Sequence, residues 1–113
     1  MYYSIESMQS APSTLREKIM KLLQESNSFL TVDEIKVLVG EELSNSEIYE
    51  HLRHIAKSIR RSSGGRKVLL MRPPTCRKCG YVFKYLSKPR KPSKCPRCRS
   101  EWIEPPAFKI ASV

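Results

Sequence analysis

Four cysteines, in two closely spaced pairs, are the residues of this sequence best suited to chemistry. Two residues separate Cys76 from Cys79 and Cys95 from Cys98, and fifteen residues lie between the pairs. This is the spacing of a tetrahedral site in which four thiolates bind one metal ion, because a tight turn at each pair directs two sulfurs to the same point. Gly80 follows the first pair and can adopt the positive φ that favours such a turn. The sequence therefore predicts a structural four-cysteine zinc site.

Two other uses of the cysteines fit the same spacing. Iron takes the same four-sulfur tetrahedral ligands as zinc, and the spacing fixes the geometry better than the ion. Two disulfides would also use all four cysteines, although nothing else in the chain suggests a secreted protein. Four thiolates leave zinc no open position for a water molecule, and no Ser/His/Asp or paired-carboxylate arrangement is recognisable. We therefore expect no enzymatic activity.

The length and the distribution of prolines favour two small units that position this site. The chain has 113 residues, and most of its eight prolines follow Arg72. We expect a disordered or loosely packed lead-in at 1–12, a helical domain at 13–72 and a zinc ribbon at 73–113, with Pro73-Pro74 at the boundary. A ribbon of this size usually needs its metal to fold.

The sequence carries no pattern that directs it to a membrane. No apolar run approaches the roughly 20 residues of a membrane span, and the N-terminus lacks the basic-then-apolar pattern of a signal peptide. We therefore expect a cytoplasmic protein.

The net charge of +10 is distributed unevenly along the chain. Residues 1–52 hold four basic residues against nine acidic ones, whereas residues 53–113 hold seventeen basic residues against two acidic ones. No Asp or Glu occurs between residues 51 and 100. These positive charges repel one another, and a polyanion would relieve the repulsion. Nucleic acid is the leading candidate, with an acidic protein or a membrane surface as the alternative.

Capping motifs and apolar spacing predict three helices in the first half of the chain. In each motif a Ser or Thr stands three residues before a Glu: Thr14 and Glu17, Thr31 and Glu34, Ser44 and Glu47. Such boxes satisfy the free N–H groups at a helix start. We expect helices over 14–25, from Thr31 to a C-cap at Gly40, and from Ser44 to about Arg61. The short turn between the second and third helices is typical of a helix-turn-helix.

The third helix is expected to present a polar face opposite its apolar stripe. The stripe consists of Ile48, Leu52, Ile55 and Ile59. The opposite face, at 100° per residue, holds Ser46, Glu50, Arg53, His54, Lys57 and Arg61, with Arg60 beside them. In a helix-turn-helix this helix enters the major groove, where Arg and Lys reach phosphates or guanine edges and a Glu accepts a hydrogen bond from cytosine. The alternative is an ordinary solvated helix face.

A polar turn and an apolar strand follow the third helix. The turn, 62–67, contains two glycines and carries Arg66 and Lys67, and the strand is Val68–Met71. A wing is a hairpin with a strand on each side of such a turn, but here a helix precedes the turn. We therefore predict a reduced wing with Arg66 and Lys67 at its tip, where they would contact the DNA backbone.

In the ribbon, strands are expected after each cysteine pair, at Tyr81–Tyr85 and Glu101–Glu104. The aromatic residues expected in the small core of the ribbon are Phe83, Trp102 and Phe108. The connection Lys88–Lys94 is a basic loop stiffened by prolines. It either holds phosphates or is simply a solvated loop.

With these motifs in place, the chain resembles an archaeal family of predicted transcriptional regulators in which a winged helix-turn-helix is fused to a rubredoxin-like zinc ribbon. The resemblance is carried by Cys76-Arg-Lys-Cys79-Gly-Tyr-Val-Phe-Lys84, by Pro92-Ser-Lys-Cys95-Pro-Arg-Cys98-Arg-Ser-Glu-Trp-Ile-Glu104 and by Pro106-Ala-Phe-Lys109. Over 14–72 it rests on the order of helices and the apolar strand. It implies rubredoxin-like knuckles with metal ligation by the four cysteines.

We therefore expect an α+β fold, a three-helix winged helix-turn-helix with a reduced wing followed by a small β zinc ribbon. The expected function is binding of double-stranded DNA in transcription regulation, and a homodimer would match a palindromic site. One alternative is an adaptor whose ribbon binds protein or RNA partners of the transcription or translation machinery. A second is rubredoxin-like electron transfer, which requires iron.

Overall fold

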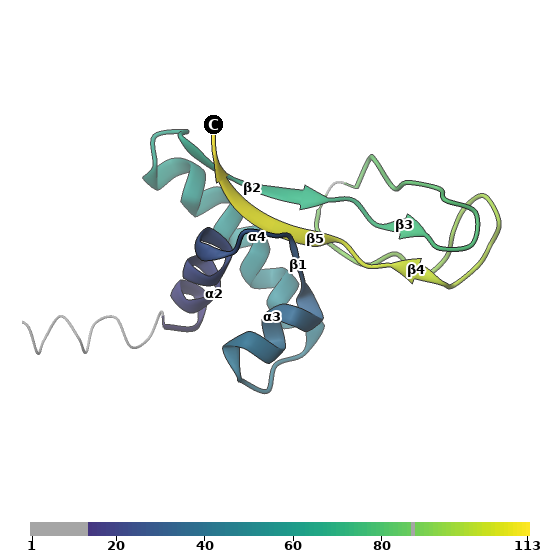
Figure 1. Ribbon diagram of the computed structural model, residues 1–113, viewed down its shortest axis with the longest axis horizontal. Coiled ribbons are helices and arrows are strands. Elements are labelled where there is room, and N and C mark those ends of the chain that lie inside the picture. The colour runs from purple at the N-terminus through teal and green to yellow at the C-terminus, as the bar shows by residue number, and fades with distance from the viewer. Residues whose placement is uncertain (1–13, 87) are drawn as a thin grey trace, which may run out of the picture.

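The computed structural model describes residues 14–86 and 88–113, so the predicted lead-in at 1–12 lies outside the described residues. The elements, in chain order, are α2 (Thr14–Glu25), β1 (Leu30–Thr31), α3 (Val32–Val39), α4 (Asn45–Ser62), β2 (Lys67–Arg72), β3 (Thr75–Cys76), β4 (Ile103–Glu104) and β5 (Ala107–Ser112) (Figure 1). The predicted α+β class and its three helices are confirmed. Among the described residues, no helix combines the length and the apolar character needed to cross a membrane.

The second and third helices begin where their capping boxes predict. The Thr31 hydroxyl accepts a hydrogen bond from the Glu34 N–H at 3.2 Å, and the Thr31 N–H donates to the Glu34 carboxylate at 2.8 Å. Ser44 and Glu47 make the same reciprocal pair at 3.1 and 2.9 Å. Gly40 ends α3 with a φ of 75°, in the left-handed region that glycine adopts without strain. Both helix starts thus follow from local sequence.

The C-terminal strand lies at the centre of the main sheet. The strand order is β1-β5-β2, so β5 pairs antiparallel with both neighbours, although it follows them by dozens of residues (Figure 1). Phe108 is opposite Leu30 on one side and Met71 on the other. The predicted ribbon segment 73–113 therefore includes a strand that packs with the helices.

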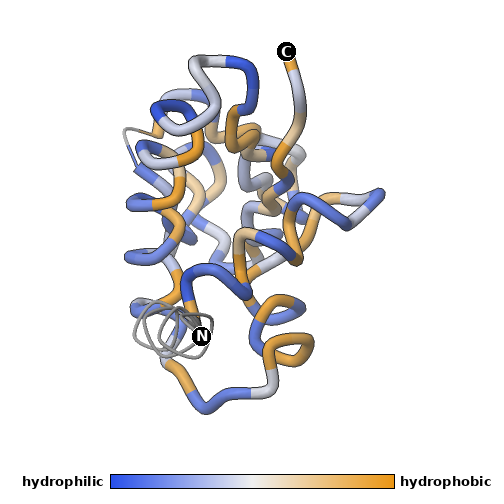
Figure 2. The backbone as a smooth tube through the Cα atoms, turned by 90° about the vertical axis from the view of Figure 1, so that its left-hand side faces the viewer, coloured by the Kyte–Doolittle hydropathy of each residue, from blue (hydrophilic) through white to orange (hydrophobic). Residues whose placement is uncertain are grey.

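One core is formed by the three helices and this sheet. The buried stripe of α4 packs with Ile19 and Leu23 of α2, and Phe108 and Ile110 of β5 complete the cluster. Figure 2 shows hydrophobic and hydrophilic stretches alternating along the helices, as expected for amphipathic helices with one buried face. The Phe108 ring is fully buried and meets Tyr49 of α4 edge to face, with ring centroids 6.3 Å apart. The prediction that Phe108 belongs to the ribbon core is therefore wrong.

The ribbon continues the hairpin formed by β2 and β5. Arg72 is opposite Ala107 at the end of that ladder, and Thr75 is opposite Glu104 where β3 and β4 begin to pair. The two ladders share one register, which sets Pro73 and Pro74 against Pro105 and Pro106. Proline has no N–H to donate, so the ladder is interrupted at these positions and resumes beyond them.

The hairpin of β2 and β5 shows where the turn at 62–67 lies. The partner strand of β2 is β5, and the ribbon occupies the end of the hairpin, whereas the turn that carries Arg66 lies at the opposite end (Figure 1). The Lys67 ammonium donates to Gln24 of α2 at 3.2 Å. Arg66 and Lys67 therefore do not lie at the closed end of the β2–β5 hairpin, and a local pattern cannot reveal a partner strand that far along the chain.

The ribbon has less strand and a smaller core than expected. Within Tyr81–Tyr85 only Val82 forms a bridge, to Thr75, and the second predicted strand is limited to Ile103–Glu104. Cys76, Cys95 and Ile103 form its buried hydrophobic cluster, with Phe83 packed against them as predicted. Trp102 has 60% of its surface exposed, so its predicted place in the core is wrong.

Candidate metal centre and basic surfaces

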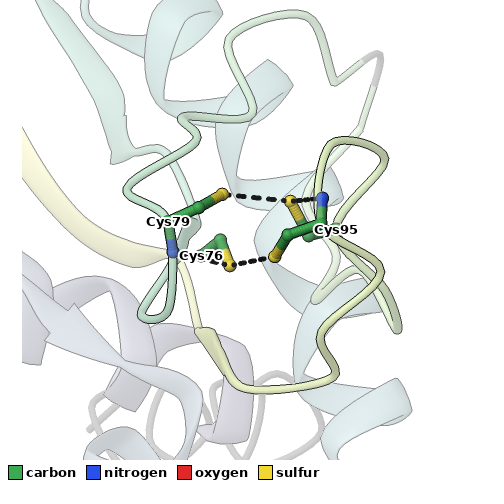
Figure 3. Close-up of side chains that lie close together, drawn as sticks. Cys76, Cys79 and Cys95 are labelled. Carbon is green, nitrogen blue, oxygen red and sulfur yellow. Dashed lines mark hydrogen bonds between the residues drawn. The ribbon is translucent and has the colours of Figure 1, made fainter.

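The four cysteine sulfurs meet at one point in the ribbon. All four Sγ atoms lie within 4.8 Å of one another, and none forms a disulfide. Cys76 and Cys98 have sulfurs 3.5 Å apart, and Cys79 and Cys95 have sulfurs 3.6 Å apart (Figure 3). In a tetrahedron with metal–sulfur bonds of about 2.3 Å, sulfurs are about 3.8 Å apart. The cluster therefore fits one tetrahedral metal ion, as predicted from the spacing.

Two turns of the same construction hold these sulfurs. In the first, the Gly80 N–H donates to the Cys76 carbonyl at 2.9 Å, and in the second the Arg99 N–H donates to the Cys95 carbonyl at 2.8 Å. Gly80 has a φ of 81° and Arg99 a φ of 65°. Arg99 is the one non-glycine residue with positive φ in the described part of the chain, so the second turn carries the backbone strain that glycine relieves in the first.

Backbone N–H groups also point at the sulfurs. The Cys79 N–H lies 3.5 Å from the Cys76 sulfur, and the N–H groups of Arg97 and Cys98 lie 3.3 and 3.4 Å from the Cys95 sulfur. Such donors stabilise thiolate charge, which is the state that binds metal. Amides directed at a cysteine sulfur are thus present in both halves of the site.

The thiol pKa values show why a cation completes the cluster. Burial opposes ionisation of Cys76, but hydrogen bonds led by that from the Cys79 N–H outweigh it and lower the pKa of Cys76 to about 6. For Cys98 the Ser100 N–H favours ionisation, but burial and the neighbouring sulfurs raise its pKa to about 11. Four negative charges cannot accumulate at this spacing unaided. A bound cation would allow all four cysteines to ionise.

The exposed face of α4 lies where the apolar stripe predicts. Its residues Ser46, Glu50, His54, Lys57, Arg60 and Arg61 are exposed, and Arg53 is partly exposed. The Glu50 carboxylate pairs with the Arg53 guanidinium at 2.6 Å and lies 3.6 Å from the His54 ring. Beyond Lys57 the face carries only basic side chains and Ser58. A contact with nucleic acid by these residues, and by Arg66 and Lys67, stays a prediction.

The two histidines of α4 do not share a site. The His51 Nδ1 accepts a hydrogen bond from Arg16 of α2 at 3.1 Å. Burial, followed by the charges of Arg16 and His54, lowers the pKa of His51. The hydrogen bond between Arg16 and His51 thus joins α2 to α4.

Sequence reasoning missed two contacts that place the ribbon. Glu104 pairs with Arg72 at 3.8 Å and with Arg77 at 3.2 Å, so one carboxylate spans the junction between the two ladders. Lys88 and Pro89 of the basic loop lie beside the exposed face of α4 and line a groove with it. No local pattern links these segments. The opposed proline pairs are the one sequence signal that the two ladders share a hairpin.

Comparison with known proteins gives matches in both parts of the chain. Residues 14–69 match the family model described as PF0610-like, N-terminal, and residues 73–113 match the PF0610 rubredoxin-like zinc beta-ribbon domain. The chain is similar to protein PF0610 from Pyrococcus furiosus, for which a solution NMR structure exists: the two are 40% identical over 88% of this chain and 90% of that chain, with a TM-score of 0.69. A comparison with curated proteins gave no significant match. The chain therefore belongs to the PF0610-like family, in which this N-terminal domain precedes a rubredoxin-like zinc ribbon.

Proposed function

We propose that this protein binds double-stranded DNA and regulates transcription, with α4 as its recognition helix. The observation that carries the proposal is the exposed basic face of α4, where Arg53, Lys57, Arg60 and Arg61 follow one another at helical spacing. Side chains at such positions reach phosphates and guanine edges when a helix lies in the major groove.

The order of elements supports a winged helix-turn-helix. A helix, a strand and two helices follow in sequence, and β2 and β5 then complete the main sheet, in which β5 lies between β1 and β2. In this interpretation α3 and α4 form the helix-turn-helix, and β2 and β5 form the wing. The ribbon then extends the wing instead of forming a separate unit.

The four-cysteine site is proposed to hold zinc in a structural role. Four sulfurs fill a tetrahedral shell and leave no position for a water or a substrate, so we propose no enzymatic activity. The ligands are Cys76, Cys79, Cys95 and Cys98, and the ion would supply the folding free energy that the small ribbon core lacks. Iron suits the same sulfurs and would instead indicate electron transfer.

A second candidate function is an adaptor that binds a protein through the ribbon. Tyr85 has 95% of its surface exposed and Trp102 has 60% exposed. Aromatic side chains are enriched in protein interfaces, and solvent exposure of both on so small a unit favours a partner for the ribbon.

Selection from random duplex DNA at about 0.15 M salt tests the proposal, because non-specific polyanion binding weakens steeply with salt. We expect the protein to enrich one sequence motif. Arg53→Ala is expected to weaken binding to that motif by about fivefold at this salt concentration, because one phosphate contact is lost. Lys21→Ala, an exposed change on α2, is the matched control and should leave the motif and affinity unchanged. Enrichment of no motif would contradict the proposal and favour the adaptor.

A further inference from the structure

The ribbon and α4 together form a groove that neither makes alone. Its volume is about 500 Å³. Its lining residues come from both units: Glu50, Arg53, His54, Ala56 and Lys57 from α4, with Lys88 and Pro89 from the basic loop. The two walls are separated by more than 30 positions in the sequence, so the groove exists only when the ribbon is folded and held against the helical unit.

The lining suits a hydrophilic anion. Arg53 and Lys57 contribute positive charge from the helix, and Lys88 contributes it from the ribbon, against the single carboxylate of Glu50. Ala56 and Pro89 are its apolar members. Among the described residues no Phe, Tyr or Trp lines the groove, and the His54 ring lies near the Glu50 carboxylate. A phosphate is recognised by such point charges without an apolar surface.

We infer that this groove holds the sugar–phosphate backbone of one DNA strand, with Lys57 contacting it from α4 and Lys88 from the ribbon. The inference rests on the proposed function and specifies where the backbone lies. Arg60 and Arg61 follow Lys57 by one helical turn on the same exposed face. A DNA strand that leaves the groove therefore meets the further positive charge of Arg60 and Arg61. A small free anion bound in the groove would not contact these residues.

Glu50 has a defined role in this arrangement. In the free protein its carboxylate neutralises Arg53 across 2.6 Å and lies near His54. A phosphate that enters the groove must compete with this carboxylate for the Arg53 guanidinium. Glu50 thus reduces the affinity for any phosphate backbone, and replacing it with the neutral isostere glutamine should free Arg53 for the strand.

Binding to a short fluorescent duplex over a range of salt concentrations tests the inference. Each lost phosphate contact reduces the magnitude of the negative slope of log K against log salt by about 0.9, which corresponds to about an eightfold loss of affinity at about 0.1 M salt. We expect this loss for Lys57→Gln and for Lys88→Gln. Lys91→Gln is the matched control, since Lys91 is exposed in the same loop but does not line the groove, and it should change affinity by less than about twofold. Glu50→Gln should bind more tightly, by up to about eightfold.

The outcomes separate this inference from the function on which it rests. If the unchanged protein does not bind duplex DNA, both fail. If it binds but Lys88→Gln behaves as Lys91→Gln does, the groove fails as the backbone site while DNA binding stands. A poly-glutamate peptide that binds as tightly as DNA, with the same dependence on Lys88, would also overturn the inference, because the groove would then accept acidic protein.

Discussion

Removal of the metal from the reduced protein is expected to unfold residues 73–106 and to leave the helical unit folded. The ribbon has three buried core residues, Cys76, Cys95 and Ile103, and two of these are metal ligands. Metal binding supplies on the order of 10 kcal/mol of folding free energy in units of this size. The helical unit keeps its own core, which contains no cysteine. NMR spectra recorded during addition of a chelator measure the two parts separately.

The same experiment should show that the helical unit depends indirectly on the metal. Because β5 follows the ribbon, an unfolded ribbon becomes a long loop that β2 and β5 must close. Closing this segment in place of a short turn costs about 2 kcal/mol of loop entropy. Urea unfolding of the helical unit should show that loss of stability, and added zinc should reverse it.

The identity of the released metal separates two functions. Zinc is expected, whereas iron would favour electron transfer. Ribbon signals that stay dispersed after chelation, with all thiols reduced, would contradict the structural role of the metal.

Phe108→Ala is expected to destabilise the helical unit by about 3–5 kcal/mol, although the residue follows the ribbon in sequence. The Phe108 ring is fully buried among Ile19, Leu30 and the α4 stripe, so its loss leaves a cavity in that core. The substitution should not change metal affinity, because the cysteine cluster has a separate core. Urea unfolding and a metal competition assay measure the two effects.

Trp102→Ala provides the matched control for this substitution. It also removes a large aromatic side chain near the C-terminus, but the indole of Trp102 is mostly exposed. We expect a cost of less than about 1 kcal/mol, as for surface substitutions generally. Loss of metal binding in Phe108→Ala, with the helical unit as stable as before, would show that β5 packs with the ribbon.

Features that depend on neighbours in sequence could be predicted, and those that depend on distant ones could not. The capping boxes at Thr31 and Ser44 fix helix starts through bonds that span three residues. The cysteine pairs form tight local turns, so their spacing predicts the metal site. The pairing of β5 with β1 and β2 has no local signal, because its short apolar pattern fits a ribbon strand equally well.

The misplaced aromatic residues follow from the same limit. Trp102 and Phe108 lie in similar apolar segments, yet one is exposed and the other is central to the helical core. The proline pair at 105–106 lies between them in the chain, after β4 and before β5. Strand pairing is interrupted at these prolines, so β4 belongs to the ribbon and β5 to the sheet that packs with the helices. The groove between α4 and Lys88 depends on that hairpin, so no local sequence pattern predicts it either.

In the proposed arrangement the metal-held ribbon places its basic loop beside α4, and the two form one surface for DNA. The most direct measurement is the affinity of Lys88→Gln and of the unchanged protein for the same duplex, each metal-loaded and then chelated under reducing conditions at about 0.1 M salt. With metal, Lys88→Gln should bind about eightfold more weakly than the unchanged protein. After chelation the unchanged protein should lose affinity and the difference between the two should largely vanish. An affinity that is unaffected by chelation while the ribbon unfolds would contradict this arrangement.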